Sequence, residues 1–237
     1  EFPDSSKLGS LDIDLKRGFI EVLGCDQPGV TIEVLAPSLS KENGADQELM
    51  TRFTPRYDVR KLPGKNEIKF DANNQDYILN LRIRVPRSTK LTLQTYRNGY
   101  VDVNGVLGEI DVRSQHCDIR LVDAAATTSA YSYNGSLTAS YSILDSNAKL
   151  DFETYNGDIT LSLPASSRLS TAVSANSGRY QTDFALADSV GNALNDSQAF
   201  GDLRSTSQQY DFAEVNGGGT PVRLECEKGR VVLRKRK

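Results

Sequence analysis

Apolar and polar residues alternate with a period of two along much of this chain, most regularly between residues 91 and 182. Successive side chains of a strand point to opposite faces, so this alternation predicts strands that bury one face. The same pattern occurs in residues 11–35, 67–85 and 214–237. The best helical candidate, the polar stretch 185–197, lacks a sustained apolar stripe. The chain is therefore predicted to be all-β.

A tight-turn phrase returns within this pattern at a nearly constant spacing. Gly99, Cys117 and Gly135 are 18 residues apart, Gly157 follows after 22 and Gly178 after 21. Glycine accepts a positive φ without a Cβ clash, and asparagine tolerates that region better than most residues. We therefore expect left-handed corners, built from Asn98, Gly99, Asn134, Gly135, Asn156, Gly157, Gly178 and Gly229.

Two kinds of fold fit this repeat. Asn-Gly between alternating apolar residues is a strong hairpin signal, but its return every 18 to 22 residues is also typical of a β-solenoid. Like corner residues stack in register in a solenoid, whereas a meander of hairpins does not require them to recur. We therefore favour a single-stranded right-handed β-helix, a solenoid-like stack of short strands, over an antiparallel meander or a β-sandwich. Its inward column would contain Val101, Ile119, Leu137 and Ile159.

Polar segments suggest how the chain is divided. We expect an N-terminal tail (1–10), an N-terminal β segment (11–89) with a polar excursion (36–66), and a β-repeat segment (90–237) with an insertion (185–209). Together they are expected to form one continuous domain. The basic residues 234–237 are interpreted as a guarded sheet edge, because Lys and Arg discourage edge-to-edge pairing.

Composition and net charge limit the classes of partner that this protein is expected to bind. Of 237 residues only 38% are hydrophobic, which suits a thin core with much surface. The net charge of −3 leaves no broad basic field for a nucleic acid, and no apolar run approaches the roughly 18 residues of a membrane span. Cys25, Cys117 and Cys226 lack metal-ligand or CxxC spacing, so unpaired thiols are favoured over a single disulfide.

The order of the phrases RGFIEVLG, LRIRVP, LTLQTYRNGYVDVNGVLGEIDV and NGGGTPVRLECEKGRVVLRK resembles the bacterial "putative-adhesin" family of β-strand-repeat domains. It is also similar to auto-transporter adhesin head domains. The resemblance covers about 11–35 and 77–237. It implies a β-helix-like domain exported to the periplasm, the outer membrane or the cell surface, with its signal segment trimmed from the sequence, and it supplies no catalytic residues. Cys117 departs from the pattern where Gly is expected, as His116 does where Asn is expected.

The sequence contains few residues of the types and spacings that catalysis or metal binding requires. A nucleophilic triad needs a base, usually His, and the sole histidine, His116, is interpreted as a turn residue. Most carboxylates, such as Asp151 and Glu153, alternate with apolar residues as the solvated face of strands does. Asp158 after Gly157 is a single partial match to the calcium-binding repeat G-G-x-G-x-D, which is not present in tandem. We therefore predict no catalytic residue, metal or cofactor.

Tyrosines are the candidate binding residues. Tyr96, Tyr133 and Tyr155 precede successive corners, and Tyr100 and Tyr131 lie nearby in the sequence. Stacked tyrosines could receive sugar rings or a protein partner, or could simply cover the thin core. The leading hypothesis is a non-catalytic exported module for binding or adhesion, with a surface glycan or a protein as ligand. The alternatives are a polysaccharide-active β-helix enzyme and a structural periplasmic domain of an envelope protein.

Overall fold

The computed structural model describes residues 2, 4, 7–35, 57–72, 78–97, 99–175, 180–188 and 210–236. Their regular structure is β-strand apart from one 3-10 turn, η1 (Pro63–Lys65), so the all-β prediction is confirmed. Most of the predicted excursion 36–66 and insertion 185–209 lies outside the described residues, as do Asn98 and Gly178. None of the described residues forms a helix with the length and apolar character needed to cross a membrane.

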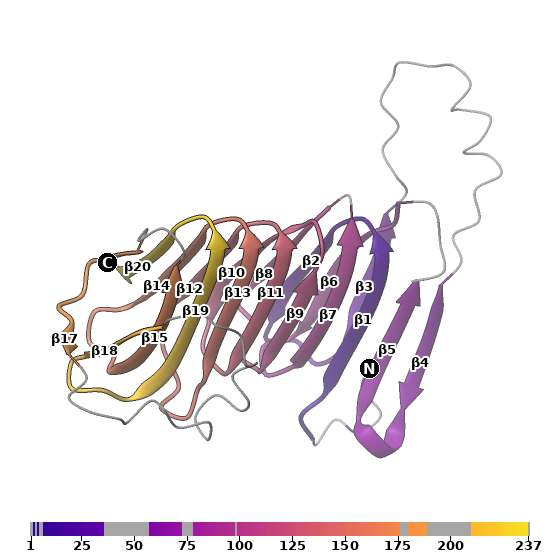
Figure 1. Ribbon diagram of the computed structural model, residues 1–237. Coiled ribbons are helices and arrows are strands. Elements are labelled where there is room, and N and C mark those ends of the chain that lie inside the picture. The colour runs from indigo at the N-terminus through magenta and orange to yellow at the C-terminus, as the bar shows by residue number, and fades with distance from the viewer. Residues whose placement is uncertain are drawn as a thin grey trace.

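The strands form two large open sheets (Figure 1). In order across the sheet, sheet A contains β17 (Ala187–Asp188), β18 (Asp211–Val215), β15 (Leu169–Ala175), β19 (Thr220–Lys228), β13 (Leu150–Asn156), β11 (Thr128–Asn134), β9 (Ile110–Ser114), β7 (Lys90–Arg97), β1 (Ser10–Arg17), β5 (Glu67–Ala72) and β4 (Asp58–Leu62). Sheet B contains β16 (Tyr180–Thr182), β20 (Val231–Arg236), β14 (Ile159–Pro164), β12 (Leu137–Tyr141), β10 (Asp118–Ala124), β8 (Tyr100–Asn104), β2 (Ile20–Cys25), β6 (Asn80–Pro86) and β3 (Thr31–Leu35). The predicted β-helix is not seen as such, because neither sheet is closed or curled.

Within the repeats the chain passes from a strand of sheet A, through a corner, to a strand of sheet B. Like strands of successive units then pair in parallel, as β11 does with β9 and β13. The strands before and after each Asn-Gly lie in different sheets, so the hairpin alternative is wrong for the repeats. Among the described strands, antiparallel pairs occur only towards the ends of the sheets, where β3, β4, β17 and β18 lie.

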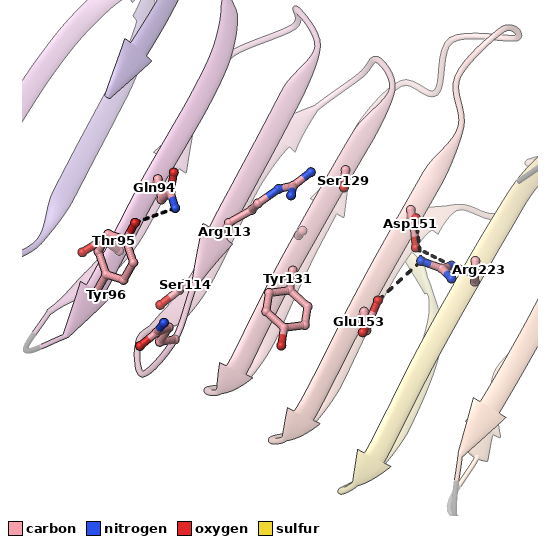
Figure 2. A pocket seen from close by; sticks show the side chains of 12 residues that line it. Gln94, Thr95, Tyr96, Arg113, Ser114, Ser129, Tyr131, Asp151, Glu153 and Arg223 are labelled. Carbon is pink, nitrogen blue, oxygen red and sulfur yellow. Dashed lines mark hydrogen bonds and ion pairs between the residues drawn. The ribbon is translucent and has the colours of Figure 1, made fainter. Parts of the chain in front are cut away.

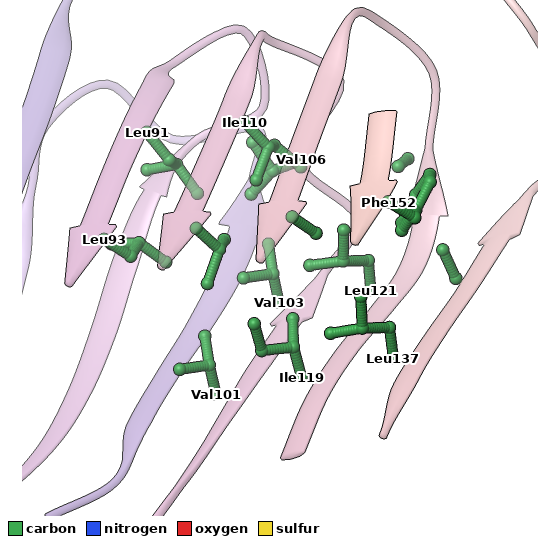
Figure 3. Packing of buried hydrophobic residues seen from close by; sticks show 14 of the residues in the cluster. Leu91, Leu93, Val101, Val103, Val106, Ile110, Ile119, Leu121, Leu137 and Phe152 are labelled. Atoms are coloured by element: carbon green, nitrogen blue, oxygen red, sulfur yellow. The ribbon is translucent and has the colours of Figure 1, made fainter. Parts of the chain in front are cut away.

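The predicted inward column is confirmed. Val101, Ile119, Leu137 and Ile159 are register partners along sheet B, and each is at most 2% exposed. Side chains from sheet A, including Leu91 and Phe152, pack against them in one core between the sheets (Figure 3). Each such side chain contributes roughly 1.5–3 kcal/mol by burial, and the period-two pattern therefore places one face of every repeat strand in this core.

The first and last units of the chain are not the outermost units of the stack. Strand β1 lies between β5 and β7, and β2 lies between β6 and β8. Similarly, β19 lies between β13 and β15, and β20 between β14 and β16. Residues 234–236 extend past the end of β16 and pair only with β14, whereas Val231, Val232 and Leu233 have a partner on both sides. Among the described residues the interpretation of 234–236 as a sheet edge therefore holds on the side where β16 ends, although the rest of β20 is interior.

The corner glycines are required for a different reason from the one predicted. None of Gly99, Gly135, Gly157 and Gly229 has a positive φ, so the left-handed corners are wrong at these positions. A Cβ on any of the four would instead lie closer than 3.0 Å to the backbone of the neighbouring unit's corner. Stacked corners approach so closely that only glycine leaves room, and this explains why the residue type recurs in register.

A ladder of buried side-chain hydrogen bonds joins the same corners. The residue three or four places before the corner position donates to the carbonyl oxygen of the neighbouring unit's corner residue. The donor–acceptor pairs are Thr95 with Gly18 (3.4 Å), Ser132 with Cys117 (3.0 Å), Thr154 with Gly135 (2.9 Å) and Cys226 with Gly157 (3.2 Å). Cys117 fits this ladder, because its backbone N–H donates to the Ser114 hydroxyl while its carbonyl accepts from the next unit.

Replacing Thr154 by valine tests the ladder. The side chain is 1% exposed and valine has nearly the same shape, so the main change is loss of the hydroxyl that bonds Gly135. We expect a loss of about 1–3 kcal/mol in the free energy of unfolding, as for a buried acceptor left unsatisfied. Thr92→Val on the exposed face of the same sheet should change it by less than about 0.5 kcal/mol. Equal effects in urea unfolding would contradict the ladder.

Candidate binding site on the outer face of sheet A

The tyrosines predicted as a binding surface divide between the two sheets. Tyr96 on β7, Tyr131 and Tyr133 on β11, and Tyr155 on β13 belong to sheet A. Their places alternate with buried residues such as Ser132 and Thr154, so these four side chains lie on the face of the sheet that is turned away from the core. Four of the five tyrosines therefore share one face of sheet A, and their role in binding stays a prediction.

Tyr100 belongs to a different surface. It lies on β8 in sheet B, where its ring stacks on Phe19 with ring centroids 5.0 Å apart and its hydroxyl donates to Glu21 at 2.5 Å. The hydrogen bond to Glu21, together with partial burial, raises the pKa of the Tyr100 hydroxyl to about 12. Sheet B thus has its own small aromatic contact, on the outer face opposite the other tyrosines.

Tyr133 and Tyr155 form a parallel stack across neighbouring strands. Their ring centroids are 4.9 Å apart with an interplanar angle of 2°, and the Lys228 ammonium lies 4.8 Å from the Tyr155 ring centroid. Aromatic pairs of this kind contribute about 0.5–1.5 kcal/mol beyond burial. The prediction that tyrosines stack between units is correct for this pair, and the stack covers the sheet beside the corners.

A hollow of about 390 Å³ lies beside this stack on the same face (Figure 2). Five neighbouring strands, β7, β9, β11, β13 and β19, contribute its lining. The lining residues are Gln94, Thr95, Tyr96, Arg113, Ser114, Gln115, Ser129, Ala130, Tyr131, Asp151, Glu153 and Arg223. Tyrosine rings, amides, hydroxyls and charged groups together can both cover an apolar ring face and exchange hydrogen bonds with a polar ligand.

Arg223 organises one end of the hollow. Its guanidinium donates two hydrogen bonds to Asp151, at 2.7 and 2.9 Å, and lies 3.5 Å from a Glu153 oxygen and 3.6 Å from a Glu225 oxygen. Burial lowers the pKa of Arg223, but the hydrogen bonds and charge of Asp151 outweigh burial and the net shift is upward. The Arg223 side chain is only 14% exposed, so this wall is pre-organised.

The rest of the hollow is more open. Arg113 contacts Asp111 of its own strand at 3.3 Å and its side chain is 62% exposed. In Figure 2 its guanidinium extends over the hollow towards Ser129, whose short side chain leaves space between Arg113 and Asp151. On the far side, the Tyr96 hydroxyl accepts a hydrogen bond of 2.8 Å from Gln94. A ligand in the hollow would therefore meet one fixed wall and one adjustable arginine.

At the described corners the polar side chains are bonded to one another. Asn156 donates to the Asn134 side chain at 2.6 Å, and Asn134 contacts Nδ1 of His116 at 2.9 Å. The histidine thus takes the place of an asparagine in a polar ladder, as a turn residue would. Asp158, the residue that partly matches a calcium-binding repeat, forms an ion pair with Arg230 at 3.0 Å. In the described part of the chain no group of three or more His, Cys, Asp or Glu side chains could hold a metal ion.

Sequence reasoning missed the charged part of the hollow. Asp151 and Glu153 were assigned to solvated strand faces, and Arg113 and Arg223 were not singled out. Arg223 is 72 residues from Asp151 in the sequence. The two meet only because β19 pairs directly with β13, which no local pattern indicates.

Comparison with known proteins adds little to this picture. No protein-family model matches the chain, and no curated protein matches it. Among solved structures, it is similar to one described as a "putative cell adhesion protein" from Clostridium sporogenes ATCC 15579. The identity is 9% and the TM-score 0.45, over 100% of this chain and 97% of that chain. At these values the likeness assigns no function, and membership of the adhesin-like family stays a prediction.

Proposed function

We propose that this protein is a non-catalytic binding module that uses the hollow on sheet A to hold a polar ligand at a bacterial cell envelope. The observation that carries the proposal is the hollow itself, where tyrosines and hydrogen-bonding side chains of five strands gather on one face. Rigid sheets position such groups more precisely than loops do. Export and an adhesive role are part of the proposal, and they rest on the sequence resemblance alone.

Binding without cleavage fits the side chains of the hollow better than hydrolysis does. Glycan cleavage uses two carboxyl groups, one as general acid and the other as base or nucleophile. Here Asp151 and Glu153 contact the same guanidinium, so both are engaged in holding the wall together. The sole histidine is bonded to Asn134 at a corner. We therefore propose a role for these carboxylates as hydrogen-bond acceptors.

Replacing Tyr131 by alanine tests this function. The intact protein should bind a subset of a glycan array, and Tyr131→Ala should weaken that binding about three- to tenfold through loss of an aromatic contact. Tyr100→Ala is the matched control, because it removes an exposed tyrosine from the opposite sheet. The proposal fails if the protein binds no glycan or protein ligand, or if both variants bind as well as the parent chain. Release of reducing ends from a bound glycan would contradict the absence of catalysis.

A further inference from the structure

The hollow is elongated across the strands. Its lining comes from β7, β9, β11, β13 and β19, which are consecutive in sheet A, whereas each strand contributes only one to three neighbouring residues. Neighbouring strands lie about 4.8 Å apart, so the five strands span about 19 Å along the stack. A site of this length accommodates several sugar rings in a row, and a monosaccharide would fill only part of it.

Two arginines and two carboxylates line the hollow, namely Arg113, Arg223, Asp151 and Glu153. Two further carboxylates outside the lining contact the same arginines, Asp111 at Arg113 and Glu225 at Arg223. These two guanidinium groups and four carboxylates together leave a net charge of two negative units at neutral pH. Both arginines already have acidic partners, so neither offers an unpaired positive charge to an anionic ligand.

Carboxylates, paired arginines and tyrosine rings together should favour uncharged glycans over acidic ones. Carboxylate oxygens retain lone pairs that accept hydrogen bonds from sugar hydroxyl, amide or ammonium groups. A uronic acid or a sulfate would instead place a like charge beside them, which is how a site rejects a wrong ligand. The tyrosine rings provide the apolar contact that both kinds of sugar would share.

We infer that the ligand of this hollow is an oligosaccharide without acidic groups, lying across the strands of sheet A from Tyr96 to Arg223. The inference rests on the proposed function, because it assigns a ligand class to the same site. Arg113, whose side chain is exposed, would cover the bound chain near its middle. Glu153 is the residue that most directly opposes an acidic sugar, since it lines the hollow and lies farther from Arg223 (3.5 Å) than Asp151 does (2.7 Å).

The test compares matched sugars. Tetrasaccharides of glucose, galactose, mannose and N-acetylglucosamine would be printed beside tetrasaccharides of glucuronic and galacturonic acid and sulfated glycosaminoglycan fragments. We expect binding to at least one uncharged series and no binding to its acidic counterpart at low salt. Glu153→Gln should reduce the preference for the uncharged sugar about three- to tenfold, the effect of removing one charge near a partly exposed site. Added salt should reduce the preference too.

A variant on the opposite sheet provides the control. Glu21→Gln removes a glutamate that is also paired with an arginine, Arg82 at 3.1 Å, and is similarly exposed, but it lies on sheet B. It should leave the preference unchanged. Preferential binding of acidic glycans that depends on Tyr131 would overturn the inference while leaving the proposed function intact. Glycan binding that neither Tyr131→Ala nor Glu153→Gln alters would place the ligand elsewhere and overturn both.

Discussion

Gly157→Ala is expected to destabilise the protein by about 3 kcal/mol or more, because a Cβ at this position has no room. It would lie closer than 3.0 Å to the carbonyl group of Gly135 and to the backbone nitrogen of Ser136. Overpacking typically costs about 1–3 kcal/mol, and here the obstacle is the neighbouring unit's backbone, which is held by its own hydrogen bonds. The melting temperature should fall by roughly 6–12 °C in a domain of this size.

Three further variants separate close approach from backbone conformation. Gly157→Asn should be at least as damaging as alanine, whereas a left-handed corner would make asparagine mild. Gly217 has a φ of 81°, and a Cβ there would meet only the Arg168 side chain at an ordinary contact distance of 3.8 Å, so Gly217→Ala should cost only about 1–2 kcal/mol. Gly64→Ala, where a Cβ meets nothing within 4 Å, should be close to neutral. Thermal melts that rank Gly157→Asn with Gly64→Ala would refute the close-approach account.

Removal of residues 219–237 is expected to abolish cooperative folding. These residues form β19 and β20, which lie between other units in both sheets, so their loss leaves a gap inside the stack. Five buried apolar side chains go with them, namely Val222, Leu224, Cys226, Val231 and Leu233. At roughly 1.5–3 kcal/mol each, their burial is comparable with the whole stability of a domain, about 5–15 kcal/mol.

Fragment complementation provides the positive control for this deletion. A synthetic peptide of residues 219–237, added to the shortened chain, should restore the circular dichroism spectrum and the melting transition by re-entering between β13 and β15. If the last unit of the chain were also the last unit of the stack, the shortened chain would still fold with a modestly lower melting temperature. That outcome would contradict the interior position of β19 and β20.

Local patterns predict much of the fold here because strand formation depends on neighbouring residues. Period-two alternation identified the buried face of the repeat strands, and alignment of the corners, which recur every 18 to 22 residues, placed Val101, Ile119, Leu137 and Ile159 in one column. The repeat also indicated stacking, since like residues recur only where they meet. These features follow from short-range sequence because side-chain direction alternates strictly along a strand.

The reason for the corner glycines could not be obtained in the same way. Glycine is required at a position either because φ is positive or because another backbone approaches closely. The sequence shows that glycine is present but does not show which of the two reasons applies. At Gly157 the second reason applies, and it becomes visible only when Gly135 is placed beside it. The tyrosines show a similar limit, because Tyr96 and Tyr100 lie only four residues apart, before and after Gly99, and the sequence alone does not show that the two belong to opposite sheets.

The all-β character of this protein, the buried faces of its repeat strands and the residues that stack from unit to unit could all be predicted from the sequence. The two open sheets, and the position of the terminal units inside the stack, became known from the three-dimensional structure. The contacts of Arg223 with Asp151 and Glu153 beside the tyrosines also could not be predicted without the three-dimensional structure. Alternation and turn chemistry depend on neighbouring residues, so they can be read from the sequence. The pairing of β19 with β13 joins residues 72 positions apart, and it depends on β20 pairing with β14 in the other sheet at the same time.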